Sequence, residues 1–286
     1  MDRGETSSAA PTAAGGGGGK WRALGYVPNV IGYVRIFLGA LAFVDWRNAQ
    51  RFCVLYALSF VLDAADGYAA RRFNQASELG SYLDMITDRV ATMALLAVTA
   101  VSAGELHDAI SGSAVSVLGL RQQHTHFLQQ RLITLLLDRD CAFALQTALL
   151  LLVALDGVSH WNQMLAGLTN EVGSHKQANR NRLLQFYYWR PVLTVVCIFN
   201  ELFLLMLFVL LQQSSGKTYA PGASLWQTWE FPLTMVTVLL VISFPFFVLK
   251  QGVSVQQIAS SHFTILRGAS RQSRARDREV QKNVSR

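Results

Sequence analysis

Charged residues are scarce in this chain. Asp, Glu, Lys and Arg together make up 15% of its 286 residues, whereas about a quarter of the residues in soluble globular domains are charged. Hydrophobic residues make up 51% of the chain, and the mean hydropathy is positive. The shortage of charge therefore argues against a soluble globular protein and predicts an all-α, polytopic membrane protein.

Cysteine is rare as well. The three cysteines, Cys53, Cys141 and Cys197, are isolated from one another within or beside apolar runs. This spacing indicates neither a disulfide framework nor a thiolate metal site.

The amino-terminal stretch lacks an apolar core. Residues 1–19 read MDRGETSSAAPTAAGGGGG, which is typical of a disordered tail and not of a cleaved signal peptide. We therefore predict a disordered tail and juxtamembrane segment over residues 1–23, a membrane domain over 24–250, and a basic cytosolic tail over 251–286.

Long apolar runs are what the chain does contain. Six of them are near or somewhat below the ~20 residues that a helix needs to cross the hydrocarbon of a bilayer. They are Asn29 to Val44, Phe52 to Leu62, Tyr82 to Val101, Cys141 to Trp161, Val192 to Leu211 and Pro232 to Leu249. The second run reaches full length only if the segment with Asp63 and Asp66 continues the same helix.

Lysine and arginine are distributed unevenly between the ends of these runs. If the six runs cross the membrane alternately, 17 basic residues lie on the side of both termini and of the loop after Asp66, and 6 lie on the other side. By the positive-inside rule, both termini and this loop face the cytosol. The tail after Leu249 carries enough positive charge to sit against an anionic leaflet, and we assign it no chemistry.

Four aspartates lie in or beside the second and third apolar runs. Asp63 and Asp66 are spaced i, i+3 and Asp84 and Asp88 are spaced i, i+4, so each pair projects from one face of a helix. A charge at the centre of a membrane helix costs ~2.5–3.5 kcal/mol, so the four carboxylates must face inward and be compensated. Carboxylate oxygens without nearby cysteine or histidine favour Mg²⁺, Mn²⁺ or Ca²⁺. The pattern predicts a site for two ions of the Mg²⁺ type.

Small residues and an arginine accompany the aspartates. Gly67 and Ala70 leave the helix face beyond Asp66 almost bare, and Gly80 does the same on the opposing helix. Arg71 can make charge-assisted hydrogen bonds to phosphate oxygens. This combination favours a ligand that carries a pyrophosphate, although small residues in membrane helices more often serve helix packing.

These eight residues fit every fixed position of the pattern D-x-x-D-G-x-x-A-R-(x8)-G-x-x-x-D-x-x-x-D. In this pattern the chain resembles the CDP-alcohol phosphatidyltransferase class I family. The segments YVPNVIGYVRIF, LDGVSHW, GSHK and YYWRP make it most similar to the eukaryotic phosphatidylinositol synthases of that family. The resemblance covers residues 24–102 and 141–211 well and the remainder weakly.

The resemblance implies an enzyme that transfers a phosphatidyl group from CDP-diacylglycerol to myo-inositol, with Mg²⁺ or Mn²⁺ as cofactor. It implies the four aspartates as metal ligands, with Asp88 also acting as the general base. It implies that five residues line the CDP-diacylglycerol site: Gly67, Ala70, Arg71, Ser77 and Gly80. It further implies a homodimer in endoplasmic reticulum or Golgi membranes, and no nucleic acid is expected as a partner.

An acceptor that offers only hydroxyl groups needs several donors and acceptors at the cytosolic ends of the spans. The residues of suitable type are Asn29, Arg35, His175, Lys176 and Arg190. Other interpretations stay open, because Arg35 can pair with the aspartates, and Lys176 and Arg190 can hold lipid phosphates.

The chain departs from the family between Ser102 and Asp140, where the connection between the third and fourth runs is longer than expected. The topology above predicts a lumenal insertion over residues 102–140, opposite the active site. His124 and His126 lie in it, but two histidines without a third ligand are more typical of polar surface than of a metal site.

Two other functions remain open. One is a related phosphatidyltransferase that uses serine, glycerol phosphate or another alcohol as acceptor. The other is a cation transporter, because intramembrane aspartates also mark ion pathways. A transporter does not need the spacing of Arg71 and the glycines, and the sequence shows none of the inverted repeats of many transporters.

Overall fold

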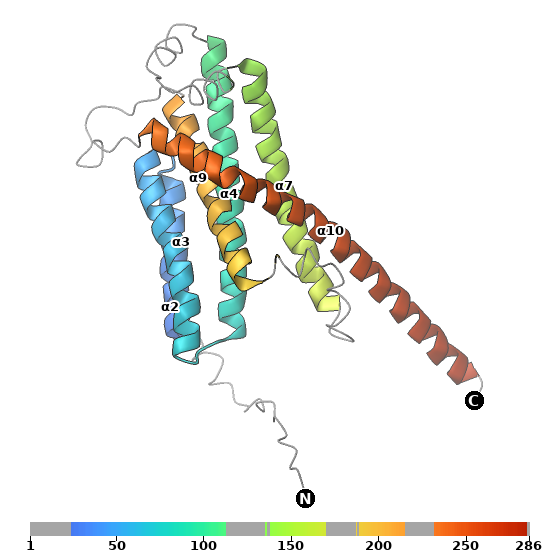
Figure 1. Ribbon diagram of the computed structural model, residues 1–286. Helices are drawn as coiled ribbons and strands as arrows, with labels where there is room; N and C mark the ends of the chain where they lie inside the picture. Colours follow the sequence, from blue (N-terminus) through green and yellow to red (C-terminus); the bar gives the residue numbers. More distant parts are fainter. Residues whose placement is uncertain are drawn as a thin grey trace, which may run out of the picture. The chain divides into compact units, whose positions relative to one another are not determined.

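The structure is a computed structural model that describes residues 24–112, 135, 138–169, 187, 189–214 and 232–284. These residues form six long helices and no strand (Figure 1). The helices are α2 (Val27–Val44), α3 (Ala49–Arg72), α4 (Glu78–Gly112), α7 (Arg139–Thr169), α9 (Arg190–Ser214) and α10 (Leu233–Val284). All six are long and apolar enough to cross a membrane, which confirms the predicted fold class and number of spans.

The helix bounds refine several predicted segments. Helix α3 includes Asp63 and Asp66, so the second span does reach full length through them. Helix α4 continues to Gly112, so the first part of the predicted insertion extends the third span. Residues 1–23, His124 and His126 lie outside the described part of the chain. The predicted basic tail is helical as far as Val284.

Side chains and prolines mark several helix starts. The side-chain Oδ1 of Asn48 accepts a hydrogen bond from the Arg51 amide (3.2 Å) at the start of α3. Asp138 does the same for the amide of Cys141 (3.3 Å) at the start of α7. Helix α10 begins directly after Pro232, which cannot donate a backbone hydrogen bond. Each arrangement meets the need of the first helical turn, whose amides have no partner within the helix.

The chain divides into two compact units. Unit 1 comprises Met1–Leu41 and Leu55–Thr87, and unit 2 comprises Ala42–Val54 and Asp88–Arg286. Unit 1 thus contains the aspartate-bearing parts of α3 and α4 up to Thr87.

The core of unit 2 is built around α9. The ring of Phe208, which is fully buried, packs against Phe52 (centroid distance 4.8 Å) and Trp46 (6.4 Å). On α10, Phe246 and Phe247 stack on two further rings of α9, with centroid distances of 4.5 and 4.3 Å. Aromatic packing of this kind is directional, so it fixes the register of α10 against α9.

Candidate active site

A tight connection joins the two helices that carry the aspartates in unit 1. Helix α3 ends with Asn74 in the left-handed region (φ 51°), and the Gln75 amide donates to the Ala70 carbonyl (3.0 Å). This is the Schellman arrangement, for which asparagine is the usual substitute for glycine. Two residues later, Ser77 Oγ accepts the Gly80 amide (3.0 Å) and caps α4. The short connection turns the chain back and places the start of α4 beside the end of α3.

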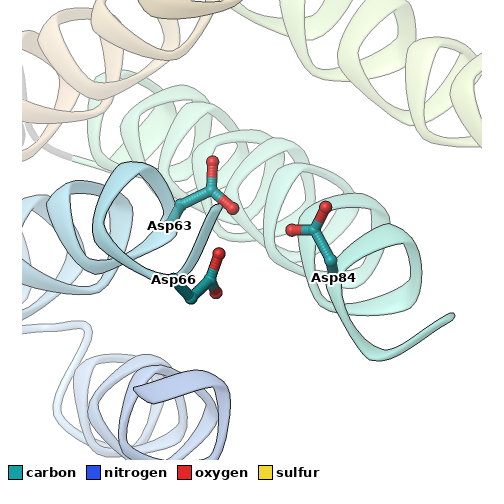
Figure 2. Close-up of side chains that lie close together, drawn as sticks. All are labelled: Asp63, Asp66 and Asp84. Carbon is teal, nitrogen blue, oxygen red and sulfur yellow. The ribbon is translucent and has the colours of Figure 1, made fainter. Parts of the chain in front are cut away.

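Three of the predicted metal ligands converge in unit 1. Figure 2 shows the carboxylates of Asp63 and Asp66 on α3 directed toward the same space as that of Asp84 on α4. One carboxylate oxygen of each lies within 4.8 Å of the others. The side chain of Asp66 is 12% exposed and that of Asp84 is 51% exposed, so the group runs from the interior to an accessible edge. Oxygen donors in this arrangement suit a hard divalent cation.

Arg35 lies among these carboxylates. Its Nη1 atom is 2.5 Å from Asp63, 3.0 Å from Asp84 and 3.8 Å from Asp66, and its side chain is 4% exposed. The backbone carbonyl of Arg35 accepts a hydrogen bond from Ser59 Oγ on α3 (3.0 Å). One guanidinium against three carboxylates leaves the group with excess negative charge. The site therefore still fits a divalent cation, and like-charge repulsion favours its binding.

Asp88 belongs to unit 2 and lies one helical turn after Asp84 in α4. Its backbone carbonyl accepts a hydrogen bond from Thr92 Oγ1 (3.0 Å), which also lies 2.7 Å from Glu201 Oε1. Thr92 thus ties this turn of α4 to α9. The metal-binding and base roles of Asp88 stay predictions.

A cavity of about 160 Å³ opens beside the aspartates in unit 1. Two of the aspartates and four of the five residues predicted to hold CDP-diacylglycerol line it: Asp66, Asp84, Gly67, Ala70, Ser77 and Gly80. The fifth, Arg71, is an exposed residue in the last turn of α3, beside Gly67. The structure thus brings carboxylates and bare helix faces to one cavity within a single unit.

Gly80 is required by a side chain rather than by a neighbouring backbone. A Cβ atom at this position would lie 2.6 Å from Oδ1 of Asn29, which is 2% exposed. At Gly67, by contrast, the nearest atom to a Cβ would be Arg71 Nη1 at 3.5 Å, an ordinary contact. The missing side chain of Gly80 leaves space that Asn29 fills, whereas the missing side chain of Gly67 leaves space that belongs to the cavity.

The acceptor candidates fall into two groups. Asn29 and Arg35 line the same cavity. Arg35 also forms an ion pair with the aspartates, which was the alternative role considered for it in the sequence. His175 and Lys176 lie outside the described residues, as does the side chain of Arg190. Contact of these five residues with an acceptor stays a prediction.

Gln75 is a cavity residue that the sequence did not indicate. Its Oε1 atom accepts a hydrogen bond from the Val27 amide (3.0 Å) and thereby holds the start of α2. A lone glutamine in a short loop has no recognisable pattern, because its partner lies 48 residues away in the sequence.

A second charge cluster, in unit 2, was also missed. Asp156 on α7 is 1% exposed, and its Oδ1 atom lies 2.8 Å from Lys250 Nζ on α10. Arg89 Nη1 on α4 and His160 Nδ1 lie 4.0 and 3.7 Å from the same oxygen. The signal was available in the sequence, because an aspartate inside an apolar run needs a partner of opposite charge.

The chain is similar in sequence to a known protein family and to several named proteins. The family model described as CDP-alcohol phosphatidyltransferase matches residues 25–169. The protein named CDP-diacylglycerol--inositol 3-phosphatidyltransferase from Saccharomyces cerevisiae is 34% identical over 239 residues, which cover 82% of this chain and 83% of the yeast protein. The proteins of that name from Schizosaccharomyces pombe and, as form 1, from Arabidopsis thaliana are 32% and 30% identical. Each of these two matches covers 82% of this chain and 86% of the relative. No solved structure gives a significant match.

Proposed function

The chain belongs to the CDP-alcohol phosphatidyltransferase family, and on this premise we propose that it is a phosphatidylinositol synthase. The reaction transfers the phosphatidyl group of CDP-diacylglycerol to myo-inositol and releases CMP. The names of relatives from fungi and plants, matched over about four fifths of the chain, support the choice of inositol as acceptor.

One observation carries the chemistry. Carboxylate oxygens of Asp63, Asp66 and Asp84 lie within 4.8 Å of one another, beside a cavity lined by residues with little or no side chain. A nucleotide pyrophosphate needs both features, because its charge must be neutralised and its flat groups must approach the helices closely.

We assign the metal site to Asp63, Asp66, Asp84 and Asp88. When bound there, Mg²⁺ or Mn²⁺ supplies neutralisation of the pyrophosphate and of the charge that develops on the departing CMP. Arg35 balances part of the carboxylate charge when no cation is bound. Its buried position suits this role better than direct contact with the acceptor.

We assign proton transfer to Asp88. An alcohol is a weak nucleophile near neutral pH, so a positioned carboxylate must accept its proton as the oxygen attacks the phosphorus. The bond from phosphorus to the CMP oxygen breaks as the bond to the inositol oxygen forms. The proton of the attacking hydroxyl is then held at a carboxylate oxygen of Asp88.

We assign the substrate site to the cavity of unit 1. Gly67 and Ala70 leave space along α3, Ser77 and Gly80 line the start of α4, and Arg71 lies at the end of α3 to pair with phosphate oxygens. The distribution of basic residues supports a cytosolic active site, where myo-inositol enters from water. We also propose a homodimer in the endoplasmic reticulum or Golgi membrane, as the resemblance implies.

An acceptor panel tests the proposed function. Membranes that contain the full chain are supplied with CDP-diacylglycerol, Mn²⁺ or Mg²⁺, and labelled inositol, serine or glycerol phosphate in turn. We expect labelled lipid and CMP with inositol alone. Labelled lipid with serine or glycerol phosphate instead of inositol would show that inositol is not the acceptor. Cation flux without CMP release would contradict an enzymatic function and favour a transporter.

A further inference from the structure

Gln75 lines the cavity of unit 1 from the short connection between α3 and α4. Its side-chain oxygen accepts a hydrogen bond from the backbone amide of Val27 (3.0 Å). Val27 is the first residue of α2, so its amide has no partner within that helix. The side chain of Gln75 therefore caps α2 from a segment 48 residues away in the sequence.

This hydrogen bond determines the orientation of the Gln75 carboxamide. A backbone amide can only donate, so the carboxamide oxygen must face Val27 and the NH₂ group must be the part that is left over. Within the part of the chain that the structure describes, the side chain of Gln75 makes no second hydrogen bond. Its NH₂ group is thus a fixed donor that is available to a ligand in the cavity that Gln75 lines.

The cavity has a charged end and an uncharged end. Asp66 lies six residues before the end of α3, and Asp84 lies six residues after the start of α4. At 1.5 Å per residue, each of these aspartates is about 9 Å along its helix from the connection. The polar residues that line the cavity at the connection, Gln75 and Ser77, carry no charge. A nucleoside diphosphate whose phosphates and metal lie at the carboxylates therefore places its uncharged nucleoside toward the connection.

We propose that Gln75 selects cytosine over uracil in the activated substrate, by donating a hydrogen bond from its NH₂ group to N3 of the base. This inference rests on the proposed function, which requires a cytidine nucleotide. N3 of cytosine is an acceptor, whereas N3 of uracil carries a hydrogen and can only donate. A fixed donor at this position pairs with cytosine and leaves two opposed donors with uracil. Enzymes that hold a single base commonly read this edge of it by hydrogen bonds.

Gln75→Glu separates the two roles of the side chain. It keeps an oxygen that accepts the Val27 amide, but it replaces the NH₂ donor by a second acceptor. The probes are labelled CDP, UDP and 2′-deoxy-CDP, whose dissociation constants for the full chain in detergent are measured with Mn²⁺. Binding of these nucleotides requires no acceptor alcohol, so the result does not depend on which alcohol the enzyme uses.

Asn74→Asp is the matched control, because it adds the same negative charge one residue away. Asn74 is not among the residues that line the cavity, and aspartate tolerates its left-handed conformation (φ 51°). CDP and UDP carry the same diphosphate, so an added charge weakens both equally. The ratio of their dissociation constants therefore reports the base contact alone.

We expect the wild-type chain and Asn74→Asp to bind CDP about 10-fold more tightly than UDP, which is the worth of one well-placed hydrogen bond. In Gln75→Glu we expect the preference to reverse toward UDP, because the new acceptor pairs with the N3 hydrogen of uracil. Gln75→Leu lacks both the cap and the donor, so we expect it to bind the two nucleotides equally and more weakly.

An unchanged ratio in Gln75→Glu, or equal binding of CDP and UDP by the wild-type chain, would overturn the base contact. A change confined to the ratio of CDP to 2′-deoxy-CDP would overturn it as well and would place the donor at the ribose. Equal loss of CDP and UDP in Gln75→Glu, as in Gln75→Leu, would show that the side chain only caps α2. If the wild-type chain bound none of the three nucleotides, the proposed function itself would fail.

Discussion

The aspartate cluster of unit 1 and the charge cluster of unit 2 both place carboxylates in apolar helices, but with opposite balances of charge. In unit 1, Asp63, Asp66 and Asp84 lie around the guanidinium of Arg35. In unit 2, one carboxylate, Asp156, is surrounded by Lys250, Arg89 and His160. An excess of carboxylate leaves a demand for a cation, whereas the charge of Asp156 is already balanced by Lys250 and Arg89.

Because of this difference in charge balance, we expect the cluster of unit 1 to serve function and the cluster of unit 2 to serve stability. Removing a carboxylate from unit 1 lowers like-charge repulsion, so it harms cation binding and not folding. Removing the carboxylate from unit 2 takes away the partner of the buried Lys250 ammonium, so it harms folding first. The same change, aspartate to asparagine, is therefore expected to have opposite signatures in the two clusters.

Asp88 gives the largest expected effect, because it is assigned both metal binding and proton transfer. Asp88→Asn is expected to lower the turnover number by about 10²–10⁴-fold, the range for loss of a general base. Raised metal concentration does not restore turnover, and binding of labelled CDP-diacylglycerol is largely retained. A near-normal rate at neutral pH would refute the assignment of the base.

Asp66 tests the metal site alone. In Asp66→Asn, the metal concentration for half-maximal CMP release is expected to rise by at least ~10–100-fold, since loss of even an outer partner of a metal site costs that much. Raised Mn²⁺ or Mg²⁺ restores turnover, and the unfolding temperature in detergent is unchanged or higher.

Asp45→Asn is the control for the metal titration, because Asp45 pairs with Arg51 at an exposed position of unit 2 (3.0 Å). It is expected to leave the metal dependence unchanged. If Asp66→Asn instead lost stability without a change in metal dependence, the contrast between the clusters would fail.

Asp156 tests the cluster of unit 2. Asp156→Asn is expected to lower the free energy of unfolding by about 3–5 kcal/mol, the usual cost of removing one partner of a buried ion pair. Replacing both partners, as in Asp156→Leu with Lys250→Met, recovers part of this loss, because the buried ammonium of Lys250 is removed together with its carboxylate partner while Arg89 remains. Thermal unfolding in detergent measures both variants.

The exposed pair of Asp45 and Arg51 again provides the matched control. Its side chains are 44% and 42% exposed, and Asp45→Asn is expected to cost at most about 1 kcal/mol. A comparable loss in Asp45→Asn and Asp156→Asn would show that burial does not set the strength of the pair.

The sequence predicted those features that depend on local spacing. The i, i+3 pair Asp63 and Asp66 shares a helix face with Gly67 and Ala70 nearby, and the helical period alone determines this. The pairing of Asp156 with Lys250 joins residues 94 apart in the sequence. It depends on how α7 packs against α10, which no local period encodes. The position of Arg35 among the aspartates of two other helices was left open for the same reason.

Gly80 tests a smaller effect than Asp156, namely whether this glycine is needed for helix packing or for ligand space. In Gly80→Ala, the new methyl group would lie 2.6 Å from Asn29 Oδ1, and overpacking of this kind costs about 1–3 kcal/mol. Asn29→Ala added to this variant removes the closer of two crowding oxygens and leaves Ser77 Oγ at 3.1 Å, so the unfolding temperature recovers in part.

Gly67→Ala is the counterpart, because its methyl group meets only Arg71 at an ordinary distance. It is expected to keep or raise the unfolding temperature, since alanine favours a helix over glycine by about 1 kcal/mol. The methyl group enters the cavity, so the KM for CDP-diacylglycerol rises. Equal unfolding temperatures for the two glycine variants would show that Asn29 moves aside for the new methyl group. Gly80 would then leave space for the ligand, as Gly67 does, and would not be needed for packing.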